Sequence, residues 1–263
     1  MGGWRSFVAV GDSFTEGMDD PYPDGRTYRG WADLVAHHLA RLARPADFRY
    51  ANLAIRGRLF NNVVDEQVPL AIAMKPDLVS FAAGGNDVLR RNFDPHALAE
   101  RYDRTIERIR STGADVLIFR FADVTRRLPG ARWVRPRVDV LNQAVEDTAK
   151  RHDARLVDLW ADEEFANTRL WSVDRLHLSP IGHRRVAGHV LRRLGIQPHE
   201  DWMLSAPPPD VLPWLSRKAA DARWVRLYLA PWVKRRLTGR SSGDTVTAKR
   251  PELIPLAIWP DQE

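Results

Sequence analysis

Three polar side chains that lie far apart in the chain have the types needed for nucleophilic catalysis. Ser13 ends the segment Gly11-Asp12-Ser13, and Asp174 and His177 are the two ends of the segment Asp174-Arg175-Leu176-His177. A serine hydroxyl is a weak nucleophile that needs an adjacent base, and a histidine serves as that base when a carboxylate orients its ring. The spacing allows Asp174 to fold back onto His177. We therefore predict Ser13 as nucleophile, His177 as base and Asp174 as the orienting group.

Attack of a serine on an ester carbonyl places negative charge on oxygen, which preorganised hydrogen-bond donors must stabilise. Gly57 and Asn86 lie in two turns that are rich in small and polar residues. We predict an oxyanion hole made by the backbone N–H groups of Ser13 and Gly57 and the side-chain amide of Asn86. Arg56 and Arg58 flank Gly57, so they are candidates for contacting an anionic group of the substrate. The alternative for these two arginines is a solvated rim.

Alternating strand and helix patterns must bring these residues together. Compact apolar runs predict buried strands at Ser6–Val10, Phe48–Ala54, Asp77–Ala83, Asp115–Phe121 and Arg155–Leu159. Helical patterns separate the runs, at Tyr28–Leu42, Asn61–Met74, Pro95–Ser111 and Val134–His152. This alternation predicts an α/β domain, a parallel sheet with helices on both faces. The turns that hold Ser13, Gly57 and Asn86 follow the first three strands, so they meet at the carboxyl edge of the sheet.

Two helices carry clear start and stop signals. Asp94-Pro95 is typical of an N-cap followed by a first-turn proline, and Gly113 follows that helix as a stop. Ser179-Pro180 repeats the start signal directly after His177, and Gly195 supplies the stop. His177 is therefore expected on the rim of a loop.

Together these segments resemble the SGNH, or GDSL-type, hydrolase family. Its four blocks are matched by Gly11-Asp12-Ser13, Gly57, Gly84-Gly85-Asn86-Asp87 and Asp174-Arg175-Leu176-His177. The resemblance covers about residues 6–195 and implies a flavodoxin-like three-layer α/β/α fold with a five-stranded parallel sheet. It also implies Ser13, Gly57, Asn86 and His177 as the name-giving set. Two departures from the family pattern, Phe14 and Ala54, can alter the shape of the pocket.

The resemblance implies a carboxylic ester hydrolase of the esterase or lipase type that acts through an acyl-serine intermediate. A small-molecule ester is then the substrate, and acetyl, short acyl and lipid esters and thioesters all remain open. The mechanism needs neither a metal nor an organic cofactor. Two alternatives remain: acyl transfer to a sugar or another alcohol, and an inactive binding or scaffold protein that uses the basic C-terminal region. The sequence contains no Gly-x-Ser-x-Gly elbow, phosphate-binding loop or His-Glu-x-x-His zinc motif.

The C-terminal region differs in composition from the rest of the chain. We divide the sequence into a catalytic domain at residues 1–200 and a Pro-, Trp- and Arg-rich extension at residues 201–263. Between Val211 and Arg240 there are eight Lys or Arg residues and one Asp, which accounts for the net charge of +6 of the whole chain. Apolar positions at helical spacing predict an amphipathic helix that Pro231 should break or kink.

Three interpretations of this basic segment remain. It can pack on the catalytic domain, attach peripherally to an anionic membrane through residues 211–240, or bind nucleic acid. We expect no nucleic acid partner, because no recognised binding module surrounds the segment. The chain has no cysteine and no apolar run of about 18 residues, and its first residues do not resemble a signal peptide. We therefore expect a cytoplasmic protein, and the oligomeric state is left open.

Overall fold

The computed structural model describes residues 3–25, 27–43, 48–126, 131–209, 213–238 and 241–257. Within these ranges one six-stranded sheet has the order β5-β4-β3-β1-β2-β6. Its strands are β1 Ser6–Gly11, β2 Arg49–Asn52, β3 Leu78–Ala82, β4 Asp115–Arg120, β5 Arg155–Asp158 and β6 Arg250–Pro255. The helices are α1 Ser13–Glu16, α2 Gly30–Leu42, α3 Phe60–Asn62, α4 Val68–Ala73, α5 Pro95–Arg110, α6 Ala131–Arg151, α7 Pro180–Arg193, α8 Trp214–Trp224 and α9 Ala230–Leu237. Single π-turns, η2 Val63–Gln67 and η7 Val225–Leu229, join α3 to α4 and α8 to α9.

The first five strands are parallel, as predicted, and each lies within its predicted range or extends it by one residue. The sixth strand was not predicted. β6 comes from the C-terminal extension and pairs antiparallel with β2, where Tyr50 lies opposite Ile254. Its sequence, Arg-Pro-Glu-Leu-Ile-Pro, has two prolines, which are tolerated on an edge strand because one side of that strand faces away from the ladder. The extension therefore completes the sheet of the catalytic domain.

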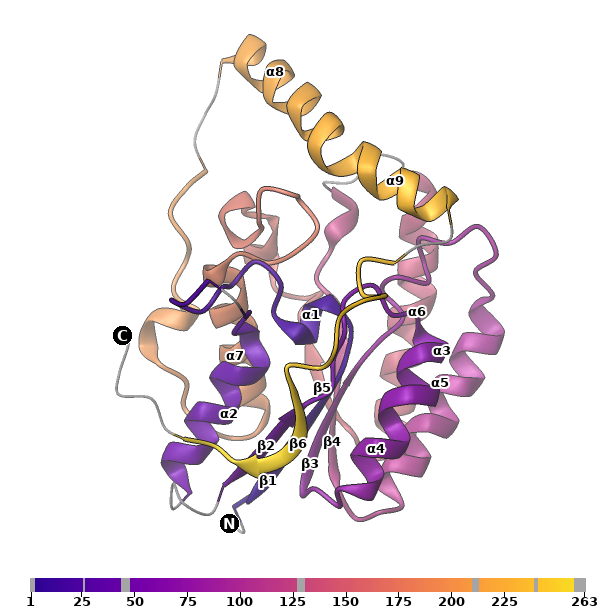
Figure 1. Ribbon diagram of the computed structural model, residues 1–263, viewed down its shortest axis with the longest axis vertical. Helices are drawn as coiled ribbons and strands as arrows, with labels where there is room; N and C mark the ends of the chain where they lie inside the picture. Colours follow the sequence, from indigo (N-terminus) through magenta and orange to yellow (C-terminus); the bar gives the residue numbers. More distant parts are fainter. Residues whose placement is uncertain are drawn as a thin grey trace.

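Two hydrophobic cores lie on opposite faces of the sheet. Alternation along β1 sends Phe7 and Ala9 to one core and Val8 and Val10 to the other. The first core is closed by α2 and α7, and the second by α4, α5 and α6. Figure 1 shows the resulting three layers, with α2 and α7 on one side of the strands and α3 to α6 on the other. This is the three-layer α/β/α arrangement predicted.

The helix signals read from the sequence are confirmed. Asp94 accepts hydrogen bonds from the N–H groups of His96 (3.0 Å) and Ala97 (3.1 Å) at the start of α5. The Ser179 hydroxyl accepts from the N–H of Gly182 at the start of α7. Gly113 and Gly195 adopt φ values of 88° and 76°, which end the two helices. The N-cap at Ser179 fixes the direction in which the chain leaves His177.

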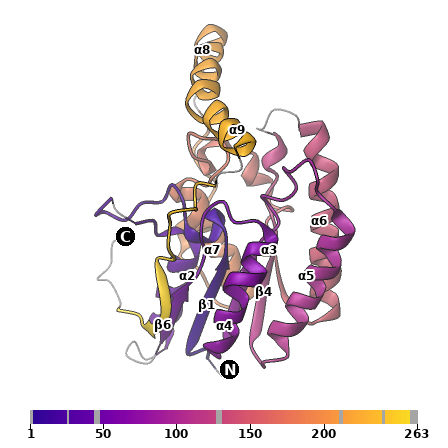
Figure 2. The same cartoon turned by 45° about the vertical axis from the view of Figure 1, so that its right-hand side comes forward.

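The extension consists of two parts that we name the arm, residues 213–238, and the strap, residues 241–257. The arm is a helix that runs through α8, η7 and α9 and crosses above the carboxyl ends of the strands (Figures 1 and 2). Of the two outcomes predicted for Pro231, a break or a kink, the break does not occur: α9 continues through the proline, and the π-turn η7 lies directly before α9. Among the described residues, no helix is long and apolar enough to cross a bilayer.

Candidate active site

Ser13 is held at the carboxyl end of β1 by a tight turn. Gly11 has no room for a side chain, because a Cβ there would lie 2.6 Å from the carbonyl oxygen of Ala82. The Gln67 side chain accepts from the Gly11 N–H (2.8 Å) and donates to the Gly11 carbonyl (3.0 Å), which fixes the end of the strand. Asp12 then caps α1 by accepting from the N–H of Phe14 (3.1 Å). The Ser13 hydroxyl is thereby presented at the edge of the sheet.

The structure brings Ser13, His177 and Asp174 into one hydrogen-bonded chain. His177 Nε2 lies 3.0 Å from Ser13 Oγ, and His177 Nδ1 lies 2.5 Å from Asp174 Oδ2. The other carboxylate oxygen of Asp174 accepts from the N–H groups of Leu176 and His177, both at 2.9 Å. With Nδ1 donating to the carboxylate, Nε2 is free to accept the serine proton.

His177 and Asp174 each stabilise the charged form of the other. Burial by itself would lower the pKa of His177, but the hydrogen bond and negative charge of Asp174 raise it above its ordinary value. Burial by itself would raise the pKa of Asp174, but hydrogen bonds and charge from His177 hold it below its ordinary value. The arrangement therefore favours an ionised carboxylate beside a histidine of increased basicity.

The loop that carries Asp174 and His177 closes on itself and is attached to the arm. Ser172 N–H donates to the His177 carbonyl at 2.8 Å, and Arg175 adopts a left-handed φ of 64° within the turn. The indole N–H of Trp224 on α8 donates to the Asp174 carbonyl at 2.9 Å. Arg175 stacks on the Trp224 ring and pairs with Asp221 at 2.6 Å. Trp224 is the one described residue of α8 that is buried, and no pattern in the sequence predicted this contact.

The two other predicted residues, Gly57 and Asn86, lie at the same site. Gly57 has a φ of 72°, and a Cβ there would clash with the hydroxyl of Ser241 from the strap. The Asn86 amide donates to Asp12 Oδ2 (3.0 Å) and to the Arg58 carbonyl (3.1 Å). The turn that carries Asn86 is thus tied to the turns of Ser13 and Gly57.

The prediction that Arg56 and Arg58 contact an anionic substrate group is not supported by their positions. Arg56 forms an ion pair with the buried carboxylate of Glu16 and stacks on Tyr28, and Arg58 pairs with Glu66 at 3.0 Å. Neither side chain lines the cavities described below. Nearby carboxylates already neutralise both guanidinium groups, which the local sequence could not reveal.

Two cavities meet at Ser13 and His177. The inner cavity has a volume of about 120 Å³ and is lined mainly by apolar side chains, among them Phe14, Val138 and Leu141. The outer cavity has a volume of about 540 Å³ and lies between the sheet edge and the arm. Its lining contains the five predicted site residues Ser13, Gly57, Asn86, Asp174 and His177, together with arm and strap residues such as Tyr228, Trp232, Arg235 and Ser241.

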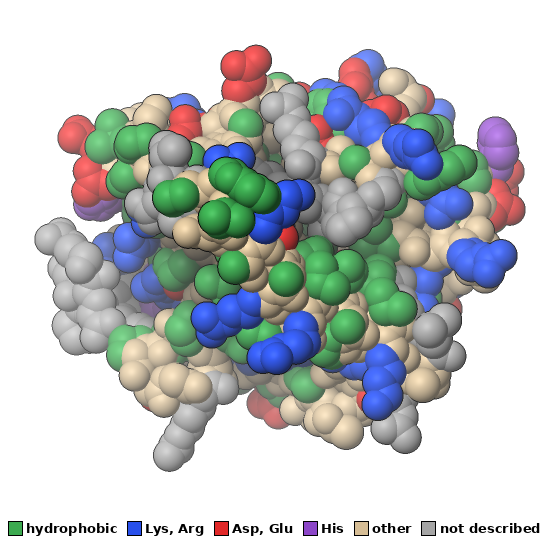
Figure 3. Space-filling model, turned by 90° about the horizontal axis from the view of Figure 1, so that it is seen from above, with side chains coloured by type: hydrophobic (Ala, Val, Ile, Leu, Met, Phe, Trp, Pro, Cys, Tyr) green, Lys and Arg blue, Asp and Glu red, His purple; other side chains and the backbone are tan. Residues whose placement is uncertain are grey.

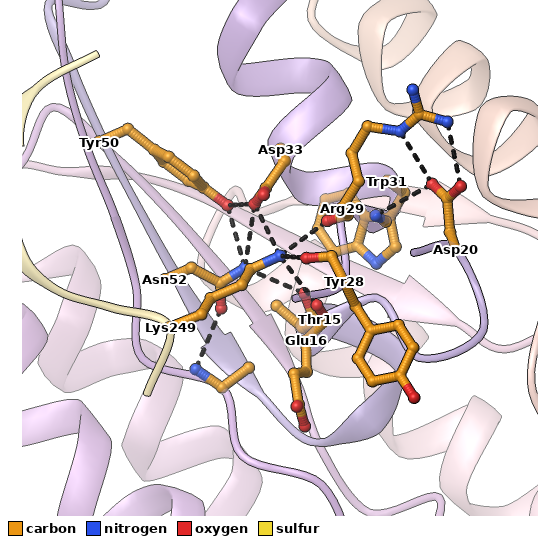
Figure 4. A network of polar contacts seen from close by, with 12 residues as sticks. Thr15, Glu16, Asp20, Tyr28, Arg29, Trp31, Asp33, Tyr50, Asn52 and Lys249 are labelled. Carbon is orange, nitrogen blue, oxygen red and sulfur yellow. Dashed lines mark hydrogen bonds and ion pairs between the residues drawn. The ribbon is translucent and has the colours of Figure 1, made fainter. Parts of the chain in front are cut away.

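The strap is anchored beside the site by a buried lysine. Lys249 Nζ donates to the carbonyls of Glu16 (2.8 Å), Tyr28 (2.8 Å) and Arg29 (2.7 Å) and pairs with Asp33 at 2.9 Å (Figure 4). Burial lowers the pKa of this ammonium, and Asp33 opposes that shift. Glu16, whose carbonyl Lys249 contacts, ends α1, the helix that Ser13 begins. A single lysine in a polar segment gave no sequence signal for this role.

One group of side chains has the spacing of a metal site in the part of the chain that the structure describes. Asp19, Asp174 and His177 offer ligand atoms within 4.8 Å of one another. Both ring nitrogens of His177 are already hydrogen-bonded, to Asp174 and to Ser13. A cation held by this histidine would displace one of these contacts, so the group fits a hydrogen-bonded chain better than a metal centre.

Comparison with known proteins identifies the family. The model of the GDSL-like Lipase/Acylhydrolase family matches residues 9–185. A curated relative, the uncharacterized protein YpmR of Bacillus subtilis (strain 168), is 35% identical over 115 residues, which cover 39% of this chain. The match spans 43% of YpmR, less than half the length of that relative. The chain therefore belongs to the GDSL-like lipase/acylhydrolase family.

Solved structures share the fold at low sequence identity. A catalytic mutant of Axe2, an acetylxylan esterase from Geobacillus stearothermophilus, has a TM-score of 0.63 at 20% identity, covering 78% of this chain and 99% of that chain. The lipase/acylhydrolase from Enterococcus faecalis has a TM-score of 0.58 at 23% identity, covering 74% of this chain and 99% of that one. At these identities the solved structures show a shared fold, which agrees with the family match.

Proposed function

We propose that this protein is a serine-dependent carboxylic ester hydrolase that works through an acyl-serine intermediate on Ser13. The observation that carries the proposal is the continuous hydrogen-bonded chain from Ser13 Oγ through His177 to Asp174. Each member has the chemistry its position requires: a hydroxyl, a base of raised pKa and an ionised carboxylate. The cavities on either side of Ser13 give an ester room to bind across it.

In the first half-reaction, Ser13 Oγ forms a bond to the ester carbonyl carbon while its proton moves to His177 Nε2. The bond between that carbon and the alkoxy oxygen then breaks, and His177 returns the proton to the departing alcohol. In the second half, His177 takes a proton from water and the resulting oxygen bonds to the acyl carbon. The bond to Ser13 Oγ then breaks as His177 returns the proton to that oxygen, which releases the carboxylic acid and restores the Ser13 hydroxyl. Asp174 stays ionised and stabilises the imidazolium throughout.

The oxyanion would be stabilised by the N–H groups of Ser13 and Gly57 and by the Asn86 amide. The Ser13 N–H is at the first position of α1, where no intrahelical acceptor exists. The Asn86 amide lies within reach of Asp12 and the Arg58 carbonyl, so it donates to the oxyanion by turning away from one of them. Burial raises the pKa of Asp12 to about 6, which weakens its hold on the amide below that pH.

The test uses p-nitrophenyl butyrate and the variant Ser13→Ala, with Ser111→Ala on the far side of the domain as control. Loss of the nucleophile should lower kcat by a factor on the order of 10⁴ or more, with an unchanged melting temperature. A fluorophosphonate probe should label the wild type and the control but not Ser13→Ala. Unchanged turnover in Ser13→Ala would refute the proposal. Adding acceptor alcohols and measuring the transferred ester distinguishes hydrolysis from acyl transfer.

A further inference from the structure

The inner cavity has the character of a binding site for an apolar chain. It begins at Ser13 and His177 and extends between the ends of the strands and α6, where Val138 and Leu141 line it. One of its polar members, His183, has both ring nitrogens engaged, by the Trp31 N–H and the Met18 carbonyl. Burial lowers the pKa of His183 to about 4, so its ring is neutral at physiological pH. Apart from His183, the polar side chains in the described lining (Asp12, Ser13, Asn86 and His177) belong to the hydrogen-bonded groups at the sheet edge, so the rest of the described lining favours an apolar group.

The size of the inner cavity limits the chain it can hold. Its volume of about 120 Å³ is slightly below that of an engineered apolar cavity of about 150 Å³ that binds benzene. About four to six carbon atoms fill such a space. The walls are closely packed: Phe14 lies against Trp31, Phe119 and Phe121, with ring centroids 5.5 Å apart in each case. A longer chain would have to displace these rings or return into solvent.

The outer cavity is larger and differs in chemistry. The arm contributes Tyr228, Trp232 and Arg235, and the sheet edge contributes Asp19 and Arg90. The Nε–H of Arg90 is buried without a hydrogen-bond partner, so it can donate to a ligand oxygen. Aromatic rings together with arginines suit a bulky group with both apolar and polar parts.

We propose that the inner cavity binds the acyl group of the ester, with a preference for four to six carbons, and that the outer cavity binds a larger alcohol moiety beneath the arm. The assignment rests on the proposed function, since Ser13 must lie between the two halves of the substrate. The hydrolysed bond then lies where the cavities meet, and the arm selects the alcohol without contacting the acyl chain.

The acyl assignment is tested with p-nitrophenyl esters of graded chain length. Each methylene buried in the inner cavity should raise kcat/KM about fourfold, up to about six carbons, and kcat/KM should fall at least tenfold at ten carbons. Leu141→Ala enlarges the cavity and should move the optimum about two carbons longer. The matched variant Leu117→Ala removes the same atoms from the core away from the cavity and should leave the profile unchanged.

Two results would overturn the acyl assignment: a flat chain-length profile, or the same shift in both leucine variants.

The alcohol assignment is tested with Trp232→Ala on 2-naphthyl butyrate and ethyl butyrate. KM should rise at least fivefold for the naphthyl ester and stay constant for the ethyl ester, and equal changes would refute the role of the arm. Loss of all turnover in Ser13→Ala tests the proposed function separately, because the substrate profile is measured on active enzyme.

A second inference concerns an apolar groove on the arm outside the outer cavity; we call the face that carries it the outward face. Val225, Leu229 and Val233 recur at four-residue spacing, and with Ala230 and Lys234 they line this groove, while Leu229 also borders the outer cavity. At the free end of α8, Trp214 and Leu215 are 65% and 66% exposed. Exposed apolar side chains that gather on one helix and are interspersed with polar residues are typical of a protein or membrane interaction site.

The charge of the arm indicates the partner. Residues 213–238 contain seven Lys or Arg residues and one acid, Asp221, which is already paired with Arg175. Viewed from above, the arm side of the molecule presents hydrophobic side chains interspersed with Lys and Arg (Figure 3). A second copy of this chain would bring like charges together. We infer that the outward face of the arm docks on an anionic phospholipid surface, with the apolar side chains inserted and the cations on the headgroups.

Flotation with phosphatidylcholine vesicles, with and without phosphatidylglycerol, tests this docking. The wild type and Ser13→Ala should bind the anionic vesicles equally and the neutral ones at least tenfold more weakly. Lys218→Glu/Arg226→Glu should lower binding at least tenfold, whereas Arg192→Glu/Arg193→Glu at the exposed end of α7 makes the same charge change and should have little effect. Equal losses in the two double variants, or a concentration-dependent dimer through the arm without vesicle binding, would refute the docking.

Discussion

The carboxyl edge of the sheet and the C-terminal extension are held in place by different kinds of contact. At the sheet edge, each site residue is fixed by hydrogen bonds from close neighbours, as when Asp174 accepts from the N–H groups of Leu176 and His177. The arm makes few such contacts: on α8, Trp224 donates to the Asp174 carbonyl and Asp221 pairs with Arg175. The strap is anchored by Lys249, which contacts residues more than two hundred positions away in the chain.

The two regions therefore have different roles at the candidate site. The hydrogen-bonded chain of Ser13, His177 and Asp174 comes from the sheet edge and its loops, whereas the roof of the outer cavity comes from the arm. Substitutions at the sheet edge should therefore change the chemical step, those in the strap should change folding stability, and those in the arm should change substrate selection. Single substitutions in each of these regions test this division.

The largest effect is expected for Asp174→Asn. The amide keeps the shape of the side chain but cannot stabilise the imidazolium, and it favours the wrong tautomer of His177. A loss on the order of 10⁴ in kcat is expected, with a melting temperature close to that of the wild type. Steady-state kinetics and thermal unfolding together test this. A loss of less than tenfold would show that the carboxylate does not act through His177.

Lys249→Met should have the largest effect on stability. The variant removes the ammonium and leaves the buried carboxylate of Asp33 without its cation, a change that typically costs about 3–5 kcal/mol. Urea unfolding at neutral pH measures it. The double variant Lys249→Met/Asp33→Asn should recover part of the loss. Unchanged stability of the single variant would mean that the strap is not part of the folding unit.

The acid side of the pH profile should report His177. Asp174 raises the pKa of His177 above 6.5, and the neutral ring is the form that accepts the serine proton. Activity should therefore rise with pH through this raised pKa, and kcat/KM should fall about tenfold per pH unit below it. A profile of kcat/KM against pH for a p-nitrophenyl ester measures the midpoint. A midpoint clearly below 6.5 would contradict the pairing.

The smallest effect is expected for Trp224→Phe. This variant keeps an aromatic ring for Arg175 but removes the hydrogen bond to the Asp174 carbonyl, which is worth about 1 kcal/mol. We expect kcat/KM to fall twofold to tenfold. Trp214→Phe at the exposed end of the same helix is the matched control and should behave as the wild type. Equal kcat/KM values for the two variants would show that the hydrogen bond from Trp224 does not contribute to activity.

Much of this arrangement could be predicted because it depends on local patterns. The parallel strands follow from short apolar runs, and the starts of α5 and α7 follow from Asp94 and Ser179, whose side chains satisfy N–H groups two or three residues away. The position of the candidate site follows from topology, because the carboxyl ends of parallel strands meet at one edge. Ser13, Gly57 and Asn86 are brought together for that reason.

The parts that could not be predicted depend on contacts between distant segments. β6 is an edge strand with two prolines and only one neighbour, so its pairing with β2 leaves no distinctive pattern. The ion pairs of Arg56 with Glu16 and of Arg58 with Glu66 could not be predicted, because both carboxylates come from other elements. In the same way, the burial of Lys249 depends on carbonyls of a turn near the other end of the chain.

The layered α/β domain and the residue types at the sheet edge follow from the amino-acid sequence alone, since both depend on periodicity and on motifs a few residues long. How far the site is enclosed depends on tertiary packing. The inner cavity is bounded by packing among α6, α7 and the strand ends, and the outer cavity by an arm that meets the site through Trp224. The size of a cavity depends on many long-range contacts at once, so no local segment of the sequence encodes it.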